Sequence, residues 1–302
     1  MTSLYLFERD SITFYMGGDV MKVGFVGAGK VGFSLGKFLS DAHVNISGYY
    51  SRSLHSAKEA AIFTNSKVFN DLSTLIYESD AVFLTVPDDA IAPVWESMKK
   101  LPISEKMICH CSGSLSSRIF SDIEKLGAYG FSIHPLLAVS DRYVSYQNFS
   151  NALFTIEGSA EKLDFMRSFL VQAGINLTVI NADAKVRYHA SAVIASNLVV
   201  ALIKTAEDEL IKCGFTEDNL QKALAPLITL NVSKVLSMGP EKALTGPIER
   251  CDLGTVQKHL DILDESSKEI YTSLSKKALE IAKKKHTEYD YSKIEKLLSE
   301  RE

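Results

Sequence analysis

Lys185 and His189 lie four residues apart in a stretch, Asp183 to Asn197, that is otherwise mostly apolar. Positions four apart share one face of a helix. Hydride transfer to a ketone creates an alkoxide, and a lysine ammonium supplies both the proton and the positive charge that an alkoxide requires. Partial burial would lower the pKa of such a lysine toward neutral pH. On spacing alone, an exposed lysine and a hydrogen-bonded core histidine are favoured, so the chemical interpretation depends on the surrounding elements.

A glycine pattern before this stretch predicts a dinucleotide site. The sequence VGFVGAGKVG places Gly27, Gly29 and Gly32 in the GxGxxG spacing, between a predicted strand at 22–26 and a helix to about residue 39. Gly27 permits the tight turn, Gly29 lets the backbone approach a pyrophosphate, and Gly32 allows close packing of helix and strand. Free N–H groups at the helix start bind phosphate. The predicted contacts are Gly27, Ala28, Gly29, Lys30, Val31 and Gly32.

The end of the second predicted strand, at residues 45–50, indicates which dinucleotide binds. NAD-binding domains usually place an acidic residue there to hold the ribose 2′-hydroxyl. This chain instead has Ser51, Arg52 and Ser53. An arginine forms bidentate bonds to phosphate, and the serines can donate to it. The sequence therefore favours NADP; the alternative is an exposed arginine without a ligand.

The predicted strand at 81–86 runs into the sequence TVPDDAI. Strand ends on this side of an open parallel sheet line the ligand crevice, so Val86 and Pro87 are expected to border the cofactor. Asp88 and Asp89 follow at the start of a predicted helix. We interpret them as caps of that helix rather than as catalytic residues.

Polar residues also follow two further predicted strands. His110, Ser112 and Gly113 follow the strand at 107–111, and His134 ends the strand at 129–134. Taken singly, each is more often a hydrogen-bonded turn residue. Together they are expected at the edge where a substrate meets the nicotinamide, with the helix that carries Lys185 as the floor of the cleft.

Alternation of short apolar runs with helical periodicity predicts the fold class. A parallel sheet covered by helices on both faces follows from such alternation. After about residue 182 only helical periodicity continues, including one long stretch over 257–285. We therefore expect an N-terminal arm at 1–20, a doubly wound Rossmann NADP-binding domain at 21–182, and an all-α substrate and dimerisation domain at 183–302. The predicted strands are 22–26, 45–50, 81–86, 107–111, 129–134, 152–156 and 177–180.

Composition excludes several classes of function. The 302 residues are 46% hydrophobic and 23% charged, and the net charge of −4 argues against nucleic acid as a partner. Four scattered cysteines without a CxxC pair indicate a reduced, cytoplasmic protein. Cys109 and Cys111 would face away from His110 in a strand, so no metal site is expected. The longest apolar run, 190–203, is interrupted by polar residues and too short to span a membrane, and no leader peptide is evident.

As a set, the motifs GAGKVG, TVPDDAI, CHCSGSL, SIHPL, KVRYHASAVIASN and ALTGPIERCDLGTVQKHL resemble the Rossmann-like proteins with a C-terminal DUF2520 domain. These are relatives of 6-phosphogluconate dehydrogenase, the beta-hydroxyacid dehydrogenases, pyrroline-5-carboxylate reductase and the coenzyme F420-dependent NADP oxidoreductases. The resemblance covers about residues 21–282. In the beta-hydroxyacid dehydrogenases a lysine and an asparagine open the corresponding helix; Lys185 matches the lysine, and His189 replaces the asparagine. Where the family reads RGD, this chain has Arg250, Cys251 and Asp252.

The resemblance implies an NADPH-dependent reductase of a small 2-oxo acid, and the best single substrate is 2-dehydropantoate (ketopantoate) in pantothenate biosynthesis. Lys185 would protonate the alkoxide with His189 assisting; the expected substrate contacts are Ser112, Gly113, His134, Asn197 and Arg250. The alternatives are a pyrroline-5-carboxylate-like imine reductase, a beta-hydroxyacid dehydrogenase and an NADP-sensing regulatory protein without turnover. The resemblance and the apolar run at 197–203 also imply a homodimer, in which Arg250 would complete the site of the other subunit.

Overall fold

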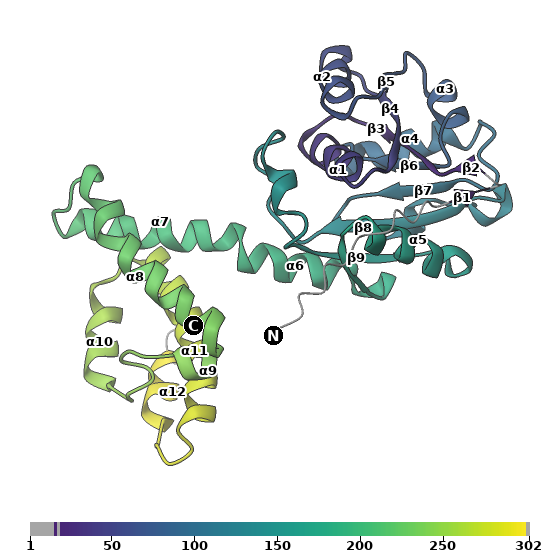
Figure 1. The fold of residues 1–302 in the computed structure, drawn as a ribbon. Coiled ribbons are helices and arrows are strands. Elements are labelled where there is room, and N and C mark those ends of the chain that lie inside the picture. The colour runs from purple at the N-terminus through teal and green to yellow at the C-terminus, as the bar shows by residue number, and fades with distance from the viewer. Residues whose placement is uncertain (1–14, 17–18, 300–302) are drawn as a thin grey trace, which may run out of the picture. The chain divides into compact units, whose positions relative to one another are not determined.

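The computed structural model describes residues 15–16 and 19–299 (Figure 1). The chain divides into two compact units, a sheet unit that ends at Asn197 and a helical unit that starts at Leu198. The boundary expected at 182/183 is too early, because Lys185 in helix α6 (Lys185–Ala195) bonds to the turn that follows strand β7 (Met107–His110) of the sheet unit. Most of the expected N-terminal arm lies outside the described residues.

The sheet unit is built on an eight-stranded sheet in the order β10-β9-β8-β7-β6-β3-β4-β5. Its six strands from β5 to β8 follow the order of a doubly wound dinucleotide-binding fold, which reverses between β3 and β6. The carboxyl ends of β3 and β6 therefore border the ligand crevice of such a fold. The strands are β3 (Lys22–Val26), β4 (Asn45–Tyr50), β5 (Lys67–Val68), β6 (Ala81–Leu84), β7 (Met107–His110), β8 (Tyr129–Pro135), β9 (Leu153–Gly158) and β10 (Asn176–Val179); a separate antiparallel pair joins β1 (Tyr15–Met16) to β2 (Asp19–Val20).

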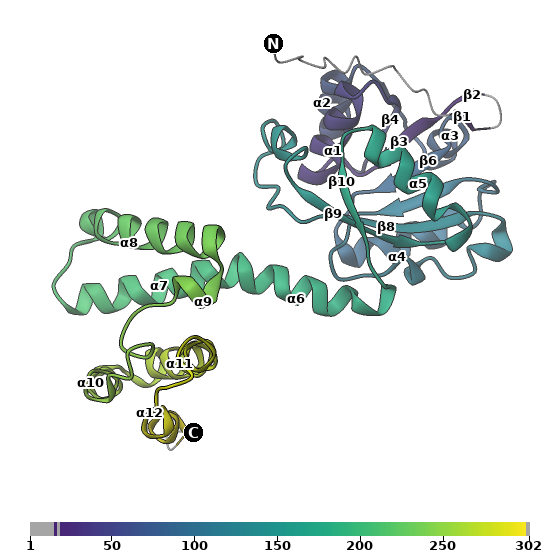
Figure 2. The ribbon, with the colours of Figure 1, turned by 60° about the horizontal axis from the view of Figure 1, so that its bottom comes forward.

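Helices cover both faces of the sheet (Figures 1 and 2). On one face, α1 (Lys30–Asp41), α2 (Leu54–Thr64) and α5 (Ala160–Gln172) bury a core that includes Phe25, Phe33 and Phe169. On the other, α3 (Leu72–Tyr77) and α4 (Asp88–Met98) pack around Trp95. The predicted fold class is confirmed. Short 3-10 helices lie at η1 (Ser117–Ile119), η2 (Glu124–Leu126), η3 (Ser145–Asn148) and η4 (Ala182–Ala184).

One strand pair departs from the predicted parallel arrangement. Strands β8 and β9 pair antiparallel, whereas the other pairs of the large sheet are parallel. No crossover helix connects β8 to β9; the intervening segment instead returns the chain in the opposite direction. An antiparallel edge on an otherwise parallel sheet is common in doubly wound folds.

The helical unit contains α7 (Asn197–Lys212), α8 (Glu217–Met238), α9 (Pro240–Ala243), α10 (Leu253–Ile262), α11 (Glu265–Lys285) and α12 (Ser292–Ser299). Its buried core is formed by side chains around Val256, Leu260, Leu279 and Ile294. The helical stretch expected over 257–285 is divided between α10 and α11, because Asp264 accepts a hydrogen bond from the N–H of Ser267 and starts a new helix. An aspartate at this position caps the free N–H groups of the helix start.

Candidate active site

The glycine turn after β3 has the backbone that the fingerprint predicts. Gly27 has φ +100°, a conformation that side chains disfavour, and its N–H donates to Tyr50 O at 2.8 Å. Gly29 precedes α1 as its N-cap, and no side chain caps the helix there. The backbone N–H groups of the first turn of α1, from Lys30 onward, therefore have no capping side chain. They are suited to bind a pyrophosphate.

The end of β4 presents the residues expected to select the dinucleotide. Ser53 is the N-cap of α2, accepting hydrogen bonds from the N–H and the hydroxyl of Ser56, and the hydroxyl of Ser51 accepts from the Ser53 N–H. Arg52 is exposed and has no protein partner within the described part of the chain. The guanidinium is therefore free for an anionic ligand, and the hydroxyls of Ser51 and Ser53 lie in the same turn.

Two hydrogen bonds of the segment after β6 connect the glycine turn to the turn after β7. The Thr85 hydroxyl, one residue beyond β6, donates to Gly27 O at 2.8 Å. Val86 and Pro87 follow Thr85, and Asp88 then accepts the Ser112 hydroxyl at 2.7 Å. The predicted cofactor-bordering residues are thus tied to both the glycine turn and the serine-rich turn after β7.

The role expected for Asp88 as a helix cap is wrong. Pro87 is the N-cap of α4, and no side chain caps this helix. The Asp88 carboxylate instead accepts the hydroxyls of Ser112 at 2.7 Å and Ser114 at 3.0 Å. A carboxylate without donors of its own suits two hydroxyls that approach together.

Every polar group of Ser112 has a partner in the protein. Its N–H donates to His110 Nδ1 at 3.2 Å, and its hydroxyl donates to Asp88 while accepting the N–H groups of Ser114 and Leu115. The neighbouring Gly113 N–H has no partner among residues that the structure describes. Gly113 is therefore the better placed of the two to offer a hydrogen bond to a substrate.

Lys185 is 1% exposed, so it is not the surface lysine that the spacing favoured. Its Nζ donates to Ser112 O at 2.9 Å and lies 5.6 Å from the centre of the Tyr188 ring. Burial lowers the pKa of Lys185 from 10.5 to about 8, against the raising effect of the Glu157 and Asp88 carboxylates. A lysine with this pKa can donate a proton near neutral pH.

Two further imidazoles face Gly113. A Cβ placed on Gly113 would lie 2.5 Å from His189 Nδ1 and 2.8 Å from His134 Nε2, so only glycine fits. The other ring nitrogen of His134 bonds the Tyr188 hydroxyl at 2.8 Å, whereas His189 Nδ1 is buried without a partner in the part of the chain described. Burial, together with the nearby positive charge of Lys185, lowers the pKa of His134 to about 4. This imidazole is therefore neutral at pH 7.

Family models match the chain in two blocks. A Rossmann-like domain covers residues 15–135, and the domain of unknown function DUF2520 covers residues 152–278. This chain is a Rossmann-like and DUF2520 domain-containing protein. The division between the two matches falls before β9, so the DUF2520 block includes Lys185, His189 and Arg250. A search of the curated proteins gave no significant match.

Solved structures are similar to this DUF2520 protein over nearly their whole length. They include the protein TM1727 of Thermotoga maritima, with 28% identity and a TM-score of 0.70 over 87% of this chain and 99% of that chain. An imine reductase from Pseudomonas sp. has 15% identity and a TM-score of 0.61 over 88% and 98% of the two chains. Plasmodium falciparum pyrroline carboxylate reductase, solved with NADP bound, has 14% identity and a TM-score of 0.55 over 87% and 98%. These likenesses show the fold.

The DUF2520 protein brings together five of the predicted residues within the sheet unit. Lys185, His189, Ser112, Gly113 and His134 form one cluster in the sheet unit. Asn197 is exposed, accepts the Ser196 hydroxyl, and at 1.5 Å per residue lies about 18 Å along the helix axis from Lys185. Arg250 belongs to the helical unit, where it is exposed and has no side-chain partner among the described residues.

Three side chains near the cluster were not predicted as site residues from the sequence. Tyr188 is three residues from Lys185 on the same helix face and was detectable by spacing. Asp88 was misassigned as a cap, and Glu157, only 4% exposed on β9, carried no motif. In residues 15–16 and 19–299, no group of three or more histidine, cysteine or acidic residues could hold a metal ion.

Proposed function

We propose that this protein is an NADPH-dependent reductase of a small 2-oxo acid, with ketopantoate as the best single substrate. The observation that carries the proposal is the buried Lys185 ammonium. It stands in the cluster beside Gly113, and bonds through Ser112, Asp88 and Thr85 connect that cluster to the glycine turn. A proton donor next to a dinucleotide turn is the arrangement that carbonyl reduction requires.

The residues present fit NADPH, which supplies a hydride when bound. Gly29 leaves open space above the turn, since a Cβ there would have no neighbour nearer than Thr85 O at 3.9 Å. The helix start from Lys30 would hold the pyrophosphate, and Arg52 with Ser51 and Ser53 would hold a 2′-phosphate. The related fold of pyrroline carboxylate reductase is solved with NADP bound, which supports this cofactor.

Each residue near Lys185 has a proposed part in the reaction. The Gly113 N–H binds the carboxylate of the oxo acid. His134, as a neutral imidazole, and His189 bind its carbonyl or hydroxyl oxygen. Lys185 gives its proton to the oxygen that becomes the product hydroxyl, and the positive charge of its protonated form stabilises the developing alkoxide. Solvent then returns a proton to the lysine.

An imine reductase is the second candidate, because an enzyme of that type has the same fold. An iminium carbon accepts a hydride without forming an alkoxide, so it does not need a lysine ammonium at the reacting atom. The buried Lys185 therefore favours an oxo acid. A beta-hydroxyacid dehydrogenase would use the same groups in reverse, and an NADP sensor without turnover would not require a buried lysine.

The test of the proposal is NADPH oxidation by purified protein over a panel of 2-oxo acids, cyclic imines and beta-hydroxyacids. We expect ketopantoate to give the highest kcat/KM, and the gene to restore growth of a pantothenate-requiring strain that lacks ketopantoate reductase. Turnover of a cyclic imine alone would move the assignment to the second candidate. NADPH binding without turnover of any compound would favour the sensor.

Cofactor preference gives a sharper prediction. Arg52→Ala should raise the KM for NADPH at least about tenfold, because one charge-assisted phosphate bond is worth roughly 1.5–3 kcal/mol. The KM for NADH should change little, since NADH lacks the 2′-phosphate. Steady-state rates with both cofactors measure the effect, and Lys58→Ala, which removes an exposed cation from α2, is the matched control. Equal use of NADPH and NADH by the wild-type protein would contradict the assignment.

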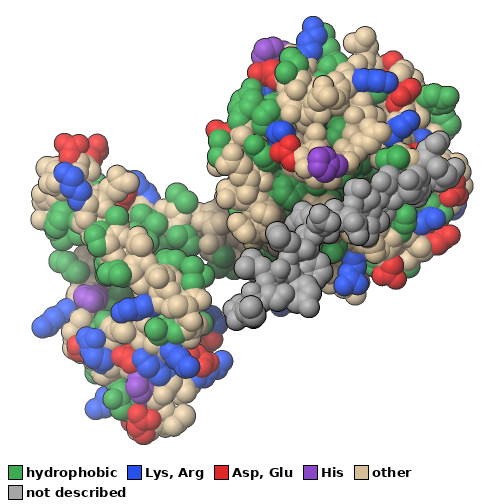
Figure 3. All heavy atoms as spheres, viewed as in Figure 1, with side chains coloured by type: hydrophobic (Ala, Val, Ile, Leu, Met, Phe, Trp, Pro, Cys, Tyr) green, Lys and Arg blue, Asp and Glu red, His purple; other side chains and the backbone are tan. Residues whose placement is uncertain are grey.

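The proposal includes a homodimer. Helices α7 and α8 bury only Leu220, and large apolar side chains gather on their surface in Figure 3. Val200 is 69%, Leu227 67% and Leu236 82% exposed. Apolar patches of this kind on one face usually mark an interaction surface.

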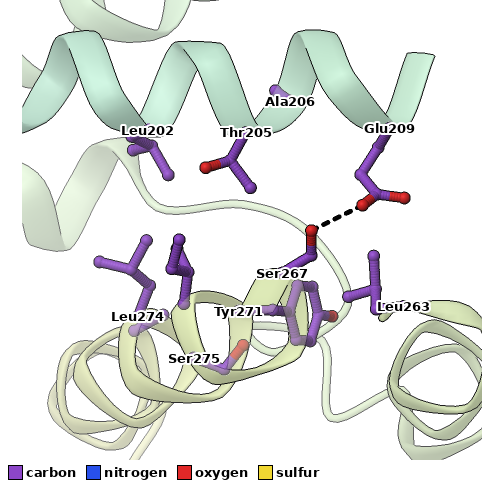
Figure 4. Close-up of a pocket in the computed structure, with 11 residues that line it drawn as sticks. Leu202, Thr205, Ala206, Glu209, Leu263, Ser267, Tyr271, Leu274 and Ser275 are labelled. Atoms are coloured by element: carbon purple, nitrogen blue, oxygen red, sulfur yellow. Dashed lines mark hydrogen bonds between the residues drawn. The ribbon is translucent and has the colours of Figure 1, made fainter. Parts of the chain in front are cut away.

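A groove between α7 and α11 continues this apolar surface. Leu202 and Ala206 face Leu274 across it, with Glu209 bonded to Ser267 at one end (Figure 4). Its volume is about 330 Å³. A helix of a second copy fits such a groove, because most of the lining is apolar and symmetric dimers are the commonest oligomers. In the dimer, Arg250 of one copy would bind the substrate carboxylate in the other copy.

A membrane is the rival explanation for the exposed helix surface. The helical stretch Ala182–Lys212 is long and apolar enough to span a bilayer by length and composition, and its most apolar part is not buried within the chain. Two observations favour a second copy. Lys185 at its start is bonded to the sheet unit. The segment between Arg187 and Lys204, which has no lysine, arginine, aspartate or glutamate, falls short of the roughly 20 residues that a span needs. We also propose a cytoplasmic location, consistent with four free cysteines.

Assembly is tested by light scattering without detergent. We expect about twice the chain mass of 33.3 kDa at micromolar concentration. Leu236→Glu should give monomers with lower activity, because it places a charge in the proposed interface. Ile62→Glu on α2, where the side chain is equally 82% exposed, should leave the dimer intact. A fully active monomer would contradict both the dimer and the shared site.

A further inference from the structure

The serine-rich segment Cys111–Ser117, which follows β7, is held at both ends by carboxylates. At the first end, Asp88 accepts the hydroxyls of Ser112 and Ser114. At the second end, Glu157 accepts the Ser117 N–H at 2.7 Å and the Ser117 hydroxyl at 2.6 Å. Asp88 comes from α4 and Glu157 from β9, so two elements that are distant in the sequence fix the path of the segment.

The path of the serine segment sets the position of the Ser112 carbonyl oxygen, which is the hydrogen-bond acceptor of Lys185. The Ser112 hydroxyl bonded to Asp88 also accepts the N–H groups of Ser114 and Leu115, which closes the turn. The closed turn leaves the Ser112 carbonyl oxygen pointing at Lys185 Nζ, 2.9 Å away. Removing the Asp88 carboxylate would free the Ser112 hydroxyl and loosen the turn that places this carbonyl oxygen.

We infer that Asp88 and Glu157 are positioning residues for Lys185: by anchoring the serine segment at its two ends, they hold the Ser112 carbonyl that fixes the ammonium at the reacting atom. The inference rests on the proposed role of Lys185. Neither carboxylate is assigned contact with the substrate. Their shared effect is geometric, and a misplacement of about 1 Å at a reacting group can cost about 100-fold in rate.

The two carboxylates also act on Lys185 through charge. The groups that surround the ammonium are Glu157, Cys111, Asp88, His110, His134 and the ring of Tyr188. Burial lowers the pKa of Lys185, and the two carboxylates oppose this. The His110 and His134 imidazoles are neutral at pH 7, since burial lowers the pKa of each to about 4. Loss of either carboxylate therefore lowers the pKa of Lys185 further.

The test compares Asp88→Asn and Glu157→Gln with Asp89→Asn. Asp89 is the adjacent exposed carboxylate in the first turn of α4, with no bond to the serine segment in the described structure. The first readout is the titration of Lys185 by NMR of protein labelled with 13C at lysine Cε, with the resonance assigned from its loss in Lys185→Met. We expect both segment variants to titrate at lower pH than wild type, and Asp89→Asn to titrate as wild type does.

The second readout is the pH dependence of kcat for NADPH oxidation. Each segment variant should lose ~10- to 100-fold in kcat at pH 7. The KM for NADPH should stay within about twofold, since the glycine turn and Arg52 are unchanged. The descending limb of the profile should move to lower pH together with the NMR titration. A purely structural role would lower kcat without moving that limb.

The outcomes separate this inference from the proposed function. An unmoved Lys185 titration in folded Asp88→Asn would overturn the inference even if the enzyme reduces oxo acids. If no oxo acid is turned over, the NMR titration still decides the inference. Asp88 is exposed, so Asp88→Asn keeps the test decisive even where the buried Glu157 variant fails to fold.

Discussion

Lys185→Met is expected to lower kcat by about 10²- to 10⁴-fold, the usual contribution of a general acid. Methionine fills the buried site with a side chain of similar length but carries neither a proton nor a charge. NADPH affinity should stay within about twofold, since Lys185 contacts the serine segment rather than the glycine turn. Stopped-flow hydride transfer and NADPH titration by fluorescence measure the two quantities.

The pH dependence of kcat in the wild-type protein should reflect the titration of Lys185. The protonated form is the active one, and burial places the pKa of Lys185 at about 8. We therefore expect kcat to be constant below pH 8 and to fall about tenfold per pH unit above it. Lys125→Met, which removes a cation whose side chain is 81% exposed, should keep both the rate and the profile. A Lys185→Met enzyme with wild-type kcat would remove the lysine from the chemistry.

The fold and the cofactor turn were predictable because their patterns are local. The glycine spacing, the strand before it and Arg52 all fall within about thirty residues, where chain direction and turn chemistry decide the structure. The sequence also placed Lys185 and His189 on one helix face. It could not predict that Lys185 is buried, since burial depends on a contact with Ser112 that is 73 positions away.

The remaining site residues needed the tertiary structure. His134 meets Tyr188 across 54 positions, and Glu157 meets Ser117 across 40. Asp88 was predicted to cap α4 because local sequence favours this role for an acidic residue at a helix start. Such a residue can instead accept a hydrogen bond from a residue distant in the sequence, as Asp88 does from Ser112. The antiparallel pairing of β8 with β9 was missed for a similar reason: apolar runs predict strands without giving their direction.

At Gly29 in the glycine turn, a substitution should weaken NADPH binding with little effect on the free energy of unfolding. At Gly29 a Cβ meets nothing nearer than 3.9 Å, and its φ of −78° suits alanine. Gly29→Ala should therefore change the free energy of unfolding by less than about 1 kcal/mol. The added methyl would occupy the space assigned to the pyrophosphate, so NADPH affinity should fall about 10- to 100-fold, or about 1.4–2.8 kcal/mol. Urea unfolding and calorimetric titration measure the two effects.

Gly32→Ala is the matched comparison within the same turn. Its Cβ would lie 2.2 Å from the Thr85 hydroxyl oxygen and 2.6 Å from Gly27 O, so the helix must move away from the strand. Such overpacking costs about 1–3 kcal/mol of stability, and NADPH binding should fall with it. Gly32 is thus required for close packing of α1 against the strand, whereas Gly29 is required to leave space for the pyrophosphate. Wild-type NADPH affinity in a folded Gly29→Ala protein would contradict the placement of the pyrophosphate over this turn, because only a ligand that keeps clear of Gly29 tolerates the methyl.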